Sequence, residues 1–192
     1  MFSQNTDSRL APSLRTAGWL NTKGDVTLDD LKGKVVVLVA FQMLCPGCVA
    51  RSIPMALRLE RLFDRRDVAV VGLHTVFEHH HVMTPAALEV FLAEYRVGFP
   101  VGIDRPDPAG GNIPVTMQAY GMRGTPTVVL IDAEGRRRAQ HFGAHDELLL
   151  GAEIGALLAE RDGARLAAPV DPVERPTEGT VGCETGACEI RA

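Results

Sequence analysis

The sequence has few cysteines, no excess of positive charge and no long apolar run. Its 192 residues hold only four cysteines, and their formal net charge is −4, which argues against the basic face that nucleic-acid binding needs. The first residues, Met1 to Arg9, contain no apolar run of the kind found in a secretory signal. No stretch approaches the length of a membrane span. We therefore expect no nucleic-acid or membrane partner and a cytoplasmic protein, in which a disulfide is usually transient and catalytic.

Length and composition predict one domain with an appendage at each end. Hydrophobic residues make up 46% and charged residues 23% of the chain, which is ordinary globular usage, and the length fits a single domain. We expect an N-terminal extension over 1–16 and the main domain over 17–161. The remainder, 162–192, is rich in proline and acid and has no aromatic residue. Such a segment buries too little apolar surface to offset the entropy of ordering, so it is predicted to be a flexible tail.

The most informative motif is Cys45-Pro46-Gly47-Cys48. It follows a run of apolar, β-branched residues over 34–41, which predicts a strand covered on both faces. Apolar residues at helical spacing then predict a helix over 45–64. Cys45 would lie at the N-terminal edge of that helix, where free N–H groups and the helix dipole favour a thiolate. A Cys-x-x-Cys pair after a strand indicates redox chemistry before metal binding.

The rest of the chain predicts alternating strands and helices. Thr84 has the chemistry of an N-cap, with Pro85 at the first helical position. The apolar run 124–132 and the segment 136–142 predict two antiparallel strands. The other expected elements are a hairpin over 17–26 with its turn at 21–24, a helical turn over 27–31, a strand over 68–74, a helix ending near 96, a strand over 99–103, a loop over 104–114, a short helix over 115–120 and a last helix over 146–161.

Together with Gly124-Thr125-Pro126 about eighty residues later, the cysteine motif resembles the thioredoxin-like family, and most of all its redoxin and thiol–disulfide reductase branch. The resemblance covers about 19–161. It implies a three-layer α/β/α sandwich with a mixed central sheet, an N-terminal hairpin and a disordered C-terminal tail. It also implies a thiol–disulfide oxidoreductase that needs no cofactor and no metal. Its partners would be a protein or small molecule containing a disulfide, and a thiol reductant.

The resemblance assigns roles to individual residues. Cys45 matches the attacking cysteine and Cys48 the buried resolving one. Pro126 matches the family's cis-proline, and the backbone of Thr125 would pair with a bound substrate. The substrate-binding residues would thus be Thr125 and Pro126, together with Pro46 and Gly47 of the motif.

The chain departs from this family's pattern around the cysteines. Val39 stands where thioredoxins have a buried aspartate, and Arg51 where some reductases have a glutamate. Pro54 falls one residue later than the helix proline of most relatives. Because the usual proton-shuttling acid is missing, Glu78 or His74 are candidates to replace it. Arg51 is a candidate to hold a thiolate by its charge.

Two other functions stay open. The motif also resembles the Thr-Pro-Gly-Cys stretch of some peroxiredoxins, in which case Cys48 would attack a peroxide. Alternatively, cysteines and histidines could bind zinc or copper. The ligands of such a metal-binding module would come from Cys45, Cys48, Cys183, Cys188, His79, His80 and His81.

The second cysteine pair, Cys183 and Cys188, lies in the predicted tail. A coil's end-to-end distance grows as about 5–6 Å times the square root of its length, so a tether of about twenty residues reaches the first pair. We hypothesise that Cys183 and Cys188 relay electrons to or from Cys45 and Cys48.

Overall fold

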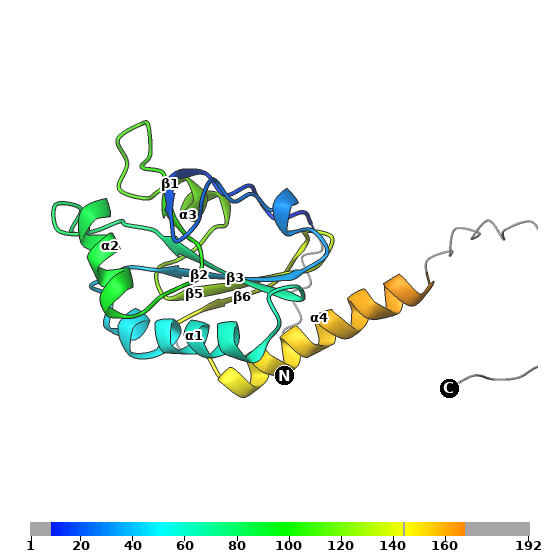
Figure 1. Ribbon diagram of the computed structural model, residues 1–192. Helices are drawn as coiled ribbons and strands as arrows, with labels where there is room; N and C mark the ends of the chain where they lie inside the picture. The colour runs from blue at the N-terminus through cyan, green and yellow to red at the C-terminus, as the bar shows by residue number, and fades with distance from the viewer. Residues whose placement is uncertain (1–8, 144, 168–192) are drawn as a thin grey trace, which may run out of the picture.

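The central element is a six-stranded mixed sheet. The computed structural model describes residues 9–143 and 145–167, and its strands lie in the order β1-β4-β3-β2-β5-β6 (Figure 1). β2 pairs parallel with β3 and β3 with β4, whereas β1–β4, β2–β5 and β5–β6 are antiparallel pairs. The strands are β1 (Thr16–Leu20), β2 (Val35–Phe41), β3 (Val68–His74), β4 (Val101–Asp104), β5 (Thr127–Ile131) and β6 (Arg137–Phe142).

Both faces of the sheet are covered, as the apolar run of the first core strand predicts. Every residue of β2 is buried, and alternate side chains point to opposite faces. Val35, Val37 and Val39 join one core cluster, while Val36 and Leu38 join the other. A strand that is buried on both faces is apolar throughout. Its apolar run therefore predicts the bounds of β2 to within one residue.

The helices form two layers around the sheet. The core on one face includes residues of α1 (Ile53–Leu62), α2 (Pro85–Glu94) and α4 (Glu147–Ala167). The other face is covered by α3 (Val115–Ala119) and by the N-terminal segment with η1 (Asp29–Leu31). In Figure 1, α1 and α4 lie below the sheet and α3 above it. The three-layer α/β/α sandwich with a mixed sheet is confirmed. The Thr84 cap is confirmed as well, because its hydroxyl accepts the N–H of Ala87 at 3.2 Å.

The predicted N-terminal hairpin over 17–26 is wrong. β1 pairs with β4, far away in the sequence. A side chain on Gly102 would come within 2.7 Å of Thr16 and 3.2 Å of Trp19, so this glycine lets the two strands pack closely. Asn21 does not turn the chain back to a second strand. Its side-chain amide instead donates to the carbonyl oxygens of Val97 and Phe99, at 2.7 and 3.2 Å.

The cysteine helix is not regular α-helix along its whole length. The segment η2 (Cys48–Ser52) is a π-helix, and the N–H of Ile53 donates to the carbonyl of Cys48, five residues earlier. A single π turn accommodates one extra residue in a helix. It therefore accounts for the late position of Pro54, which the sequence shows but does not explain.

The last helix is longer than predicted. α4 continues past Arg161, the expected end of the domain, to Ala167. Arg161 is largely buried and pairs with Asp67 at 2.9 Å and Asp162 at 2.8 Å, and Arg165 donates to the carbonyl of Gly33 at 3.1 Å. These contacts stabilise the part of α4 that extends beyond the predicted end at Arg161. Of the predicted tail over 162–192, the part from residue 168 onward, with Cys183 and Cys188, lies outside the described residues, as does half of the extension over 1–16 (residues 1–8). No helix within 9–143 or 145–167 has the length and apolar character to cross a membrane.

Candidate active site

The two motif cysteines lie where β2 leads into the helical segment, and their surroundings differ. Both are free thiols; Cys45 is half-buried and Cys48 is fully buried. The backbone N–H of Cys48 donates to the sulfur of Cys45 at 3.3 Å. Pro46 and Gly47 have helical backbone between them, so Pro46 lies in the first helical turn as the sequence predicts. The geometry gives Cys45 a backbone donor that stabilises a thiolate.

Burial makes Cys48 the less acidic thiol. It raises the pKa of Cys48 to about 12, helped by the hydrogen bond to Cys45, while the backbone of Gln42 and the side chain of Thr125 act in the opposite direction. At neutral pH Cys48 is therefore a protonated thiol until something removes its proton.

The loop before β5 faces the cysteines. The Thr125–Pro126 peptide bond is cis, which the resemblance predicted. The sulfur of Cys45 lies 3.5 Å from the carbonyl oxygen of Thr125, and a side chain on Gly47 would come within 3.3 Å of the Pro126 ring. Residues about eighty positions apart thus meet around one sulfur, and the predicted set of Cys45, Cys48, Gly47, Thr125 and Pro126 is brought together.

Gln42 is a site residue that the sequence reasoning missed. Its side chain is buried, and its amide nitrogen lies 3.3 Å from Glu78 Oε1 and 3.5 Å from Thr125 Oγ1. Its amide oxygen accepts the backbone N–H of Phe77 at 3.2 Å. A polar residue directly after a fully apolar strand was the available signal, because a buried amide needs partners of this kind.

The candidate proton acceptors and Arg51 have different surroundings. Glu78 is exposed and bonded to Gln42. His74 is buried, its Nε2 has no hydrogen-bond partner among the described residues, and burial lowers its pKa to about 4. A base this weak is poorly suited to take a thiol proton. Arg51 is exposed and, with Pro126, Ser52 and His145, lines a cavity of about 320 Å³ beside the cysteine helix.

The alternative metal-binding module gains no support from the described residues. His79, His80 and His81 are all exposed. Among residues 9–143 and 145–167, the side chains close enough to share an ion belong to another part of the fold and include neither these histidines nor Cys45 and Cys48.

A Cys-x-x-Cys pair at a helix start, beside a cis-proline at one end of a mixed sheet, defines a thioredoxin-like protein. Within that class, the chain belongs to the Redoxin family, whose model matches residues 6–147.

Its solved relatives share the fold over most of the chain. A thioredoxin-like superfamily protein, SPOA0173, is 57% identical, with a TM-score of 0.76 over 78% of this chain and 96% of its own. A thiol-disulfide isomerase from Corynebacterium glutamicum is 46% identical, with a TM-score of 0.76 over 80% of this chain and 97% of its own.

Among curated proteins, the thiol-disulfide oxidoreductase ResA of Halalkalibacterium halodurans is 29% identical over 65% of this chain and 63% of its own length. The NHL repeat-containing protein 2 of Gallus gallus is 31% identical over 53% of this chain and 14% of its own length. This chain therefore spans less than two thirds of the length of these curated relatives.

Proposed function

We propose that this protein is a thiol–disulfide oxidoreductase that acts on disulfides of a protein or small molecule. One observation carries the proposal: the half-buried sulfur of Cys45 receives the N–H of Cys48 and faces the Thr125 carbonyl beside the cis-proline. Membership of the Redoxin family and the names of the relatives support it.

The exchange takes place in two balanced steps. The thiolate of Cys45 attacks one sulfur of the substrate disulfide, forms a mixed disulfide and releases the other sulfur as a thiolate. Cys48 then loses its proton and attacks the sulfur of Cys45. This closes the Cys45–Cys48 disulfide and releases the second substrate thiolate, so that two electrons pass from the cysteine pair to the substrate. An external thiol reductant returns the pair to the dithiol state.

The second step needs a proton acceptor, because burial keeps Cys48 protonated. Glu78 is our proposed acceptor. It bonds to Gln42, which in turn lies beside Thr125 next to Cys48. In Glu78→Gln we expect resolution of the mixed disulfide to slow by about tenfold or more, while attack by Cys45 keeps its rate. Single-turnover mixing with a fluorescent disulfide separates the two steps, and an unchanged resolution rate would exclude Glu78.

Reduction of insulin disulfides by dithiothreitol tests the proposed activity. Cys45→Ser should reduce the catalysed rate to the uncatalysed background, because the other cysteine of the motif, Cys48, is buried and protonated. Cys48→Ser should retain the attack but stall after it. A Cys45→Ser variant that still catalyses the reduction would overturn the assignment.

The peroxidase alternative requires Cys48 to attack peroxide. Its sulfur is fully buried and its pKa is raised to about 12, and both properties oppose attack by a thiolate. We therefore expect negligible consumption of thiol by hydrogen peroxide. Rapid consumption that depends on Cys48 would favour the peroxidase instead.

The pair Cys183 and Cys188 is proposed to relay electrons between the reductant and the first pair, acting in the cytoplasm. The tether that supports this proposal begins after Ala167, where α4 ends, and runs to Cys183. Replacing both cysteines by serine should slow turnover with a protein reductant and leave turnover with dithiothreitol unchanged. If the variant turns over as fast as the wild type with the protein reductant, the relay is excluded.

A further inference from the structure

A second cluster of titratable side chains lies at the junction of β6 and α4. His141 on β6 and Glu153 on α4 approach within 2.8 Å, from imidazole Nε2 to carboxylate Oε2. His145, in the turn between these elements, has its Nε2 3.8 Å from the same oxygen. The two imidazole rings stack with centroids 3.8 Å apart. Three ligand atoms of these residues lie within 4.8 Å of one another. In the chain, α4 is the element that follows β6.

One atom of the cluster lacks the partner that its burial requires. His145 Nε2 is buried and has no hydrogen-bond partner among the described residues, and its side chain is only 13% exposed. Buried polar atoms of native proteins are nearly always satisfied.

We propose that His141, His145 and Glu153 bind one divalent transition-metal ion of the zinc class. Two imidazoles and one carboxylate are a ligand set that zinc takes, with a further position open to water. Ligand atoms of a tetrahedral site, each about 2.0–2.1 Å from the ion, lie about 3.3–3.4 Å apart. Glu153 Oε2 lies 2.8 Å from His141 Nε2 and 3.8 Å from His145 Nε2, so both separations are close to that spacing.

The position of the site gives the ion a structural role beside the redox centre. The backbone N–H of Gly143, between the two histidines, donates to the carbonyl of Pro126 at 2.8 Å. His145 also lines the cavity that Pro126 and Arg51 share. An ion that joins β6 to α4 would therefore fix the turn that supports the cis-proline. This proposal does not rest on the proposed oxidoreductase activity.

Metal titration of the full chain with all four cysteines replaced by serine tests the site without interference from thiols. Zinc added during calorimetry should bind with a stoichiometry of about one and micromolar or tighter affinity. Cobalt should give the visible absorption of a low-coordinate nitrogen and oxygen site. His145→Ala and Glu153→Gln should each weaken binding by at least about tenfold, since each removes a ligand.

The matched control replaces His79, His80 and His81 by alanine, which removes exposed histidines outside the cluster. It should bind zinc as tightly as its parent. Thermal unfolding is the second readout: zinc should raise the melting temperature of the parent and of the control but not that of His145→Ala. Affinity that falls with the triplet, or that survives both cluster substitutions, would identify adventitious binding and overturn the proposal.

Discussion

At the scale of single residues, the two cysteines have the same side chain in opposite settings. Cys45 sits at the helix start with an N–H directed at its sulfur, whereas Cys48 is sealed beneath it in the core. The division into attacking and resolving thiols follows from exposure and from the cost of ionising a buried sulfur.

Selective alkylation measures this difference. In a variant with Cys183 and Cys188 replaced by serine, iodoacetamide at pH 7.5 should modify Cys45 at least about tenfold faster than Cys48, because the thiolate is the reactive form. Peptide mass spectrometry over time gives both rates. Equal rates for the two cysteines would mean that Cys48 is not held as a buried thiol in solution.

His74 makes stability depend on pH. Burial lowers its pKa from 6.5 to about 4, so the unfolded chain takes up a proton in this interval and the folded protein does not. Stability is therefore complete above about pH 6.5 and falls as the pH drops through about 4, by about 3 kcal/mol at most.

Urea unfolding at pH 7 and pH 4 tests this linkage. His74→Leu should lose about 3 kcal/mol less than the wild type over this range, because leucine has no proton to bind. His80→Leu, at an exposed position, should behave as the wild type does. An identical loss in His74→Leu and the wild type would show that another group governs the acid response.

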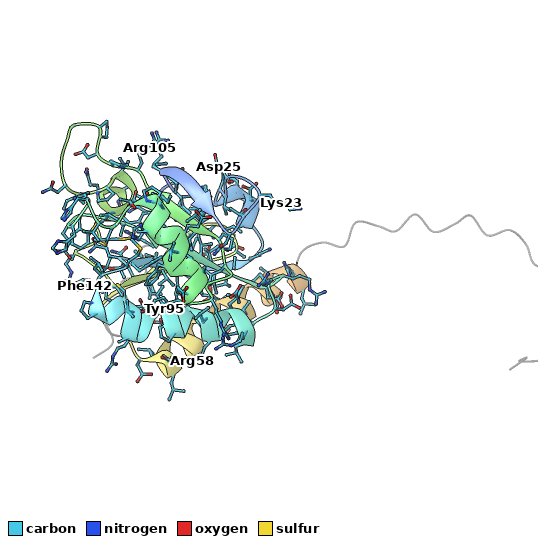
Figure 2. All side chains as sticks on the ribbon, turned by 60° about the vertical axis from the view of Figure 1, so that its left-hand side comes forward. Lys23, Asp25, Arg58, Tyr95, Arg105 and Phe142 are labelled. Carbon is cyan, nitrogen blue, oxygen red and sulfur yellow. The ribbon has the colours of Figure 1, made fainter. Side chains whose placement is uncertain are left out.

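At the scale of elements, α4 connects the two ends of the fold. Its core residues Leu150, Ile154 and Leu157 pack on the sheet, and its first turn meets α1 through the ion pair of Arg58 and Glu147, where Figure 2 shows Arg58 beside α4. Towards its other end, Arg161 pairs with Asp67, just before β3. The helix is therefore fixed at both ends by charge and in the middle by apolar packing.

Arg161→Ala should lower the free energy of unfolding by about 1–2 kcal/mol. This is less than the cost of removing one partner of a fully buried ion pair, because Asp67 stays partly hydrated without Arg161. Arg165→Ala, whose side chain is 58% exposed, should change stability by less than about 0.5 kcal/mol. Chemical unfolding of both variants gives the comparison. A larger loss for Arg165→Ala would show that the exposed last turns, not the buried arginine, anchor the helix.

At the scale of the whole molecule, the sequence predicts what depends on local pattern and on motif. β3 was predicted to the residue and β2 within one, because strands buried on both faces are continuous apolar runs. The meeting of Cys45 with Pro126 came from the family resemblance. The pairing of β1 with β4 was missed because it depends on contacts across the whole domain, made possible by Gly102.

Other features leave almost no trace in a single sequence. A π turn differs from an α turn by one residue, and only the position of Pro54 hinted at it. The end of α4 was predicted too early because Asp162 and Gly163 resemble the start of the tail. In the structure the helix continues past them, and Arg161 and Arg165 contact the rest of the domain. The cluster of His141, His145 and Glu153 has no motif, since its members meet only when β6 packs beside α4.

The most direct test of the central claim is to map the mixed disulfide that Cys48→Ser forms with oxidised glutathione in a chain whose Cys183 and Cys188 are also replaced by serine. Intact mass followed by peptide mapping should find one glutathione per chain, bound to Cys45 and released by dithiothreitol, while the same chain with Cys48 retained should show the Cys45–Cys48 disulfide and almost no adduct. The absence of an adduct on Cys45 would contradict the account.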